Sequence, residues 1–139
     1  MIKAVIDANV FISSALAPGS IPDKVIDLVR QGKITLVISP DILAEIREVL
    51  LYPKIKKRLK LTTKDADEFV SQIAKTALIT AGLFDLKVIE ADPKDDKYLA
   101  CALEGQADYI ISGDRHLLDL KSYHGIKIMT PGAFLESCQ

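Results

Sequence analysis

The sequence predicts an α/β fold in which helices cover both faces of a central parallel sheet. Short runs rich in Val and Ile are mostly continuous rather than alternating, as in strands that are buried on both faces. Segments with helical periodicity separate these runs, and Gly and Pro fall singly between them. Strands that alternate with helices form parallel sheets. We therefore predict strands at residues 2–6, 34–38, 86–89, 109–111 and 126–129.

Helices are predicted at residues 22–31, 40–51, 64–81 and 93–104. Two of them have clear starts, because Ser39 and Asp92 each precede a proline and can serve as N-caps. Asp95 would then lie at the third position of the last helix, where an acid completes a capping box. The region 53–82 is helical in pattern and longer than a minimal crossover, so we predict two extra helices inserted there between the second and third strands.

Length and composition predict a single domain over residues 1–139, because 49% hydrophobic residues supply an ample core at this size. A net charge of -1 argues against a surface that binds nucleic acid over its whole extent. No apolar stretch approaches the length of a signal peptide or a membrane span, so we expect a soluble, cytoplasmic protein with no membrane contact. Cys101 and Cys138 form no CxxC pair and are expected to be reduced thiols.

Four acidic residues are predicted to meet at one edge of the sheet. Asp7 ends the first strand, and Asp114 follows the fourth strand. Asp96 lies on the inward stripe of its helix, and Glu45 lies at the edge of the apolar face of the helix after the second strand. The ligand crevice of an open parallel sheet forms outside the carboxyl ends of its strands, so these residues point to one site. Taken singly, Asp7 and Asp114 could form turns, and Glu45 could pair with Arg47 or a lysine.

Carboxylates that crowd into a partly desolvated pocket repel one another, and they must bind protons or share a cation. A set of oxygen ligands without His or Cys favours Mg²⁺ or Mn²⁺ over zinc. Such ions commonly meet their substrates through phosphate oxygens. The chemistry that these four residues predict is therefore metal-assisted phosphodiester hydrolysis.

Several short motifs together resemble the PIN domain family. They are Asp7-Ala8-Asn9, Glu45, the run from Asp96 through Ala102, and Ser112-Gly113-Asp114. The likeness spans the whole chain and is greatest to the small single-domain prokaryotic group labelled as toxins of toxin–antitoxin systems.

This resemblance implies a three-layer α/β/α sandwich with a central parallel sheet, and a Mg²⁺- or Mn²⁺-dependent endoribonuclease. It implies that the acidic metal-binding and catalytic set is Asp7, Glu45, Asp96 and Asp114, with Asn9 and Ser112 as polar support. It also implies an RNA substrate, a small antitoxin as inhibitor, and a homodimer in which the apolar residues of the helical insertion are one possible surface.

A basic cluster follows Pro53 and consists of Lys54, Lys56, Lys57, Arg58 and Lys60. Such a cluster could contact a phosphate backbone, and the alternative is an ordinary exposed helix face. Arg115 directly follows Asp114, where it could clamp a phosphate or balance local charge. His116 and His124 are interpreted as surface or turn residues.

Two other functions stay open on the sequence. Asp7 could be the nucleophile of a phosphatase, although Asn9 stands where such an enzyme would need a second acid. The chain could also be a catalytically silent module that binds RNA or a protein. Nucleotide triphosphates and dinucleotides are disfavoured as ligands, because the chain has neither a GxxxxGK[ST] nor a GxGxxG motif.

Overall fold

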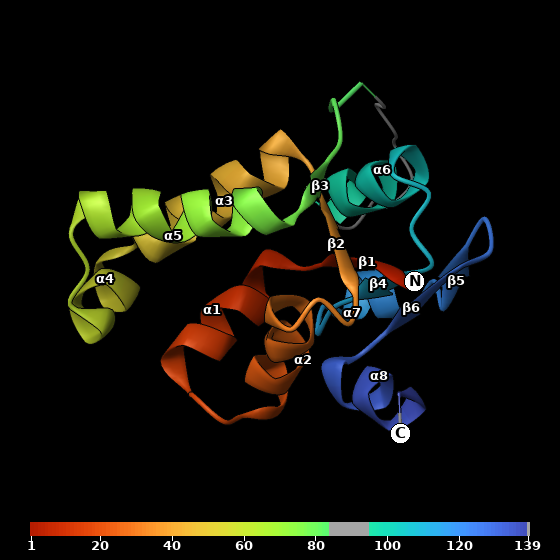
Figure 1. The fold of residues 1–139 in the computed structure, drawn as a ribbon, viewed down its shortest axis with the longest axis horizontal. Helices are drawn as coiled ribbons and strands as arrows, with labels where there is room; N and C mark the ends of the chain where they lie inside the picture. Colours follow the sequence, from red (N-terminus) through yellow and green to blue (C-terminus); the bar gives the residue numbers. More distant parts are fainter. Residues whose placement is uncertain (84–94, 139) are drawn as a thin grey trace.

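The structure is a computed structural model that describes residues 1–83 and 95–138 (Figure 1). Its strands are β1 (Lys3–Ile6), β2 (Thr35–Ile38), β3 (Leu78–Ile79), β4 (Tyr109–Ile111), β5 (Ser122–Tyr123) and β6 (Ile126–Met129). Its helices are α1 (Ala8–Leu16), α2 (Ile21–Arg30), α3 (Pro40–Leu50), α4 (Pro53–Leu59), α5 (Thr63–Thr76), α6 (Asp96–Glu104), α7 (Arg115–Leu118) and α8 (Pro131–Ser137).

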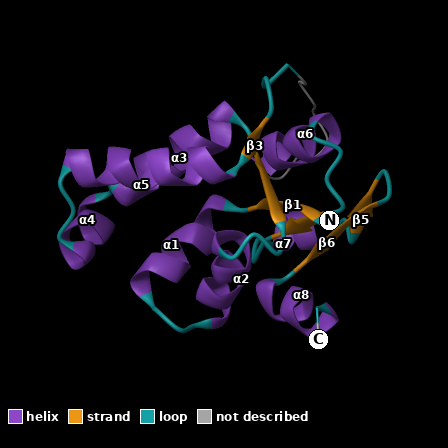
Figure 2. Ribbon diagram, viewed as in Figure 1, coloured by secondary structure: helices purple, strands orange, loops and turns teal. Residues whose placement is uncertain are grey.

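The strands form one sheet in the order β3-β2-β1-β4-β6-β5. The first five strands in this order are parallel, and only β5 pairs antiparallel, with β6. Helix α6 packs against β1, β2 and β4, whereas α1, α2 and α8 lie on the other side of the strands (Figure 2). The predicted α/β class and its largely parallel central sheet are therefore confirmed.

The four predicted strands that fall on described residues are present, because β1, β2 and β4 are apolar runs that bury most of their side chains and β6 buries Ile126 and Ile128. Val5, Val37 and Ile110 are fully buried. Their register places Ile6 beside Ile111, so the residues that follow β1 and β4 leave the sheet side by side. This pairing positions the candidate site.

The predicted helix at 64–81 is correct at its start but too long, since α5 ends at Thr76. Leu78 and Ile79 instead pair with Val37 and Ile38 of β2. The Thr80 N–H extends this ladder with a 2.9 Å hydrogen bond to the Ile38 carbonyl. The open edge of the sheet thus determines the backbone conformation here, against a helical pattern in the sequence.

Within the inserted region, α4 and α5 confirm the two extra helices, and Ser39 caps α3 as predicted, with its Oγ accepting from the Ile42 N–H. The short strand β5 and helix α8 carry too little periodicity to be predicted. The predicted strand at 86–89 and the N-cap Asp92 lie outside the described residues. No helix of the described segments is long and apolar enough to cross a membrane.

Candidate metal centre at the carboxyl edge of the sheet

Asp7 lies at the centre of the candidate site, where β1 ends and α1 begins. Its backbone N–H donates to the Ile111 carbonyl at 2.9 Å, which fixes the chain beside the end of β4. Its side chain is buried, with 3% of the residue exposed. One carboxylate oxygen, Oδ1, accepts from the Asn9 N–H at 3.0 Å and thereby caps α1. Asp7 thus caps α1, a role that the sequence analysis did not assign to it, and the capping bond orients the carboxylate.

Ser112 joins Asp7 to Asp114. The Ser112 hydroxyl is fully buried; it donates to Asp7 Oδ2 at 2.6 Å and accepts from the Asp114 N–H at 2.9 Å. The resemblance gave Ser112 as polar support, and the structure places it between the two aspartates. For Asn9 the contact with Asp7 comes from the backbone, and the residue itself is exposed.

Burial raises the pKa of the Asp7 carboxyl above its ordinary value. The hydrogen bonds from Ser112 and Asn9 oppose this increase, and the negative charge of Glu45 adds to it. Asp7 is therefore a carboxylate whose negative charge is costly in the metal-free protein. A nearby cation would relieve that cost.

Glu45 reaches the same place from α3, because Ile42 and Ile46 pack into the core and leave Glu45 at the edge of that face. The Tyr98 hydroxyl donates to Glu45 Oε1 and accepts from the Ala8 N–H at 3.1 Å. Lys97 Nζ lies 3.2 Å from Glu45 Oε2. The surface pairing considered for Glu45 thus occurs with Lys97, while Arg47 pairs with Asp67 of α5.

Tyr98 is a site residue that the sequence did not reveal, because an aromatic residue in an apolar helix pattern looks like ordinary core. Burial and the neighbouring acids Asp7 and Glu45 raise the pKa of the Tyr98 hydroxyl, so it stays protonated. A protonated hydroxyl can donate to a carboxylate while its oxygen accepts from an N–H. Tyr98 therefore ties Glu45 to the first turn of α1 beside Asp7.

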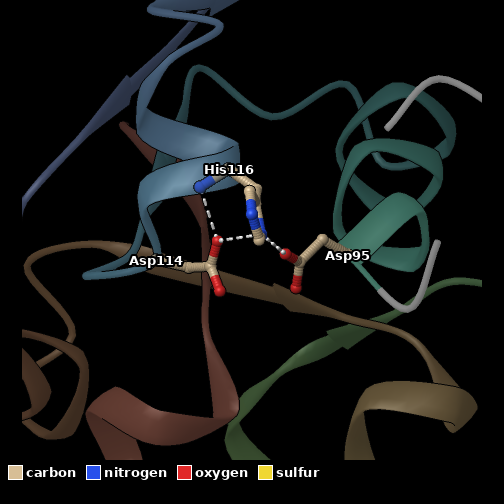
Figure 3. Close-up of side chains that lie close together, drawn as sticks. All are labelled: Asp95, Asp114 and His116. Carbon is tan, nitrogen blue, oxygen red and sulfur yellow. Dashed lines mark hydrogen bonds and ion pairs between the residues drawn. The ribbon is translucent and has the colours of Figure 1, made fainter. Parts of the chain in front are cut away.

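Asp114 faces a second acid and a histidine (Figure 3). Its Oδ1 caps the short helix α7 by accepting from the His116 and Leu117 N–H groups at 2.7 and 3.4 Å. His116 Nδ1 lies 3.6 Å from Asp114 Oδ1 and 4.0 Å from Asp95 Oδ2. One ligand atom from each of Asp95, Asp114 and His116 can be chosen so that all three lie within 4.8 Å of one another.

The predicted capping box joins Asp95 to Asp92, which lies outside the described residues. Helix α6 begins at Asp96, and Asp95 precedes it as the N-cap residue without a side-chain capping bond. Its side chain instead turns toward His116 and Asp114. Asp96 is also buried, as its inward stripe predicted. The group around Asp114, however, contains Asp95 rather than Asp96.

These residues fit a divalent ion. In an octahedral site with metal–oxygen distances near 2.1 Å, ligand atoms on opposite sides of the ion are about 4.2 Å apart. The ligand atoms of Asp95, Asp114 and His116 lie within 4.8 Å of one another, which is close to that spacing. The capping oxygen of Asp7 has a second lone pair for an ion, whereas Asp114 Oδ1 already accepts from two N–H groups and leaves Oδ2 for an ion. A histidine nitrogen suits Mn²⁺ better than Mg²⁺. The interpretation of His116 as only a surface residue therefore missed a potential ligand, although His116 is indeed exposed.

The predicted cationic contacts lie in two places. Arg115 is exposed at the start of α7, next to Asp114. Lys54, Lys56, Lys57 and Arg58 all lie on α4, beyond the far end of α3 from the sheet (Figure 1). The structure thus separates the basic cluster from the acidic edge.

Comparison with known proteins adds two findings. Residues 3–116 match the family model of the PIN domain, and this span contains Asp7, Glu45, Asp95, Asp96 and Asp114. An uncharacterised protein of Methanocaldococcus jannaschii is 34% identical over 143 residues, which cover 97% of this chain and 90% of that protein.

Proposed function

Because the chain belongs to the PIN domain family, we propose that it is an endoribonuclease that hydrolyses RNA phosphodiester bonds with Mg²⁺ or Mn²⁺. The observation that carries this proposal is the pair of aspartates at neighbouring strand ends, Asp7 and Asp114, which share the buried hydroxyl of Ser112. Ser112 contacts the carboxylate of Asp7 and the backbone N–H of Asp114, and carboxylates gathered at one edge of the sheet favour a divalent ion over a bare substrate.

The residues proposed to hold the ion are the predicted set of Asp7, Glu45, Asp96 and Asp114, to which the geometry adds Asp95 and His116. An ion bound there would supply a water of lowered pKa and would neutralise charge that develops on the phosphate.

The side chains around the ligands hold them in place. Ser112 and the Asn9 N–H orient the Asp7 carboxylate, and Tyr98 holds Glu45. Lys97 neutralises part of the charge on Glu45 and is a candidate donor to a phosphate oxygen once an ion competes for that carboxylate. Arg115, exposed beside Asp114, is a second candidate phosphate contact.

The test is cleavage of single-stranded RNA by the purified protein with Mg²⁺ or Mn²⁺, with EDTA and the Asp7→Asn variant as controls. We expect cleavage that EDTA abolishes and that Asp7→Asn reduces by at least about a hundredfold, the usual size of the loss of one electrostatic stabiliser. Asp27→Asn is a matched control, because Asp27 is an exposed acid on α2 that pairs only with Arg30 among the described residues.

Metal-dependent binding of RNA without cleavage would instead support the catalytically silent module. A covalent phosphate trapped on Asp7 would support the phosphatase. Cleavage that survives in Asp7→Asn and EDTA would exclude the proposed site.

We further propose that the protein is the toxin of a toxin–antitoxin pair, which a small antitoxin inhibits. A cavity of about 520 Å³ lies between α2 and α5, with Ile26, Val29, Phe69 and Ile73 among its lining residues, and it offers an apolar surface for such an inhibitor. Expression of the wild-type chain should arrest growth, whereas Asp7→Asn should not. A neighbouring gene whose product restores growth would identify the antitoxin.

A homodimer through the helical insertion is part of the same proposal. Helix α5 buries only Ala66 among its residues, which leaves Phe69, Val70 and Ile73 partly exposed for a second copy. Sedimentation of the purified chain tests it, and a concentration-independent monomer would exclude it.

A further inference from the structure

Helix α4 displays positive charge on nearly all of its surface. Its apolar residues Ile55 and Leu59 are half-buried and pack against the rest of the molecule. Every other position from 54 to 60 is basic and exposed. Five of the chain's 18 Lys and Arg residues therefore lie in seven consecutive positions that contain no acid.

The structure leaves this charge uncompensated. Ion pairs among the described residues join cations of other segments to acids, and none of them includes a cation of α4. The pairing of Arg47 with Asp67 shows that a cation of the neighbouring helix α3 does find an acid on α5. Cations that are exposed and unpaired within the described structure are available to an external polyanion.

An aromatic side chain stands directly beside these cations. Tyr52 precedes α4 as its N-cap residue and is 48% exposed. Most large apolar side chains near it are partly buried, so an exposed tyrosine at this point has no evident packing role. Basic side chains beside an exposed aromatic ring are the combination by which proteins bind single strands, with phosphates on the cations and a base stacked on the ring.

Helix α3 connects this surface to the carboxyl edge. Glu45 lies in the middle of α3, and α4 follows the end of α3 after Leu51 and Tyr52. The five helical steps from Glu45 to Leu50 span about 8 Å of helix. Helix α4 also contacts α1, which begins at the capping residue Asp7. The basic surface is therefore connected to the candidate metal centre through α3 but lies apart from it.

We propose that Tyr52, the four cations of α4 and Lys60, which follows the helix, form a platform for single-stranded RNA, called here the α4 platform. This inference rests on the proposed ribonuclease function and deepens it. The α4 platform binds the strand on one side of the scissile phosphate. Affinity then depends on RNA length and salt, while the bond is broken at the carboxyl edge.

The experiment measures binding of a labelled single-stranded RNA of about 12 nucleotides, a length typical of single-strand sites, in EDTA so that nothing is cleaved. The test variant combines Lys54→Ala, Lys56→Ala and Lys57→Ala. Alanine favours helix, so α4 should persist, as circular dichroism can verify. Lys60 is left unchanged because its backbone is left-handed, with φ of 55°. The matched control combines Lys33→Ala, Lys75→Ala and Lys127→Ala, three exposed lysines outside α4.

We expect the α4 variant to bind at least about tenfold more weakly at about 0.1 M salt, and to lower the slope of log affinity against log salt by about 2. The control triple should change both quantities much less. Tyr52→Ala should weaken binding without changing the slope, and Tyr52→Phe should restore it. Equal effects of the two triples would overturn the proposal. So would equal competition by duplex RNA, or a preference for phosphatidylserine vesicles over RNA.

The two proposals can fail separately. Weak binding by the α4 variant in a protein that cleaves no RNA would leave the α4 platform standing and remove the ribonuclease. If the wild-type protein instead cleaves RNA but its RNA binding does not depend on the α4 cations, the ribonuclease proposal stands and the α4 platform is excluded. In an active protein, the α4 variant should raise KM for long RNA and leave kcat nearly unchanged.

Discussion

The carboxyl edge of the sheet and the α4 platform carry charges of opposite sign, which are largely buried at the edge and exposed on the platform. At the edge, Asp7, Asp95 and Asp96 are buried, and the Ser112 hydroxyl and the Asn9 N–H fix the Asp7 carboxylate. On α4 the cations stand in water without ion pairs among the described residues. Buried charge is costly and is satisfied best by a small ion in a fixed geometry. Exposed charge costs little and suits a flexible polyanion.

The two regions also differ in how the chain builds them. The Asp7–Ser112 contact joins residues 105 positions apart, and the Tyr98–Glu45 contact joins residues 53 apart. The α4 platform is a single continuous segment. The sequence of a local segment can change without disturbing the core. The arrangement of side chains at the carboxyl edge instead depends on the register of β1 and β4. The comparison predicts large effects for changes at the edge and graded, salt-dependent effects on α4.

The largest effect should come from the neighbouring aspartates at the start of α6, which give the sharpest test of the edge. Asp95→Asn removes a carboxylate from the group with Asp114 and His116, so Mn²⁺ affinity should fall at least about tenfold and cleavage about a hundredfold. Asp96→Asn should cost less, because Asp96 lies outside that group. Electron paramagnetic resonance of bound Mn²⁺ and RNA cleavage measure the two effects. A larger loss in Asp96→Asn would mean that Asp96, the residue predicted from the sequence, is the metal ligand rather than Asp95.

A smaller effect is expected for Tyr98→Phe, which tests whether the hydrogen bonds between edge residues matter beyond folding. The variant leaves the Ala8 N–H without its partner and removes the hydroxyl donor of Glu45, which keeps Lys97, so stability should fall by about 1 to 3 kcal/mol. Because Glu45 would lose its orientation, Mn²⁺ affinity should fall about tenfold as well. Denaturant unfolding and Mn²⁺ titration separate these effects. Tyr109→Phe is the control, since Tyr109 lies on β4 with its ring against Phe134. Unchanged Mn²⁺ affinity in Tyr98→Phe would mean that Tyr98 supports the fold but does not position Glu45 for the ion.

The same contrast explains what the sequence could predict. Strand ends are visible as apolar runs that stop, so Asp7 and Asp114 could be identified before the structure was known. Ser39 and Pro40 mark the start of α3, and the helical phase then places Glu45 at the edge of its apolar face. The basic residues of α4 are contiguous and could not be missed. Each of these signals is local.

Other features depended on tertiary contacts. Asp95 and Asp96 are adjacent, and only the observed start of α6 shows that Asp95 faces Asp114. Tyr98 has the pattern of a core residue, and its hydroxyl matters only because Glu45 and Ala8 come to it from other segments. Leu78 and Ile79 left the helical pattern because β2 offered an unpaired edge. Whether such a segment continues a helix or joins the sheet depends on the assembled sheet and cannot be predicted from the segment alone.

The smallest expected effect is on stability, and it tests whether the edge is strained by its own charge. The pKa of Asp7 is raised in the folded protein, so the folded state holds its proton to higher pH than the unfolded state does. Stability is therefore lost as pH rises from the ordinary value of 3.8 through the folded pKa, and the loss persists at neutral pH.

Asp7→Asn keeps the shape of the side chain without the charge. At neutral pH in EDTA it should raise the Tm by a few degrees, since about 1 kcal/mol shifts a chain of this size by about 3 °C. The gain should shrink toward pH 4 and should vanish or reverse with saturating Mn²⁺, because the ion stabilises only the wild-type site. Asp27→Asn, whose carboxylate is exposed, should show no such gain. A lower Tm for Asp7→Asn at neutral pH in EDTA would mean that the hydrogen bonds of Asp7 outweigh the cost of burying its charge, and the edge would then need no cation to be stable.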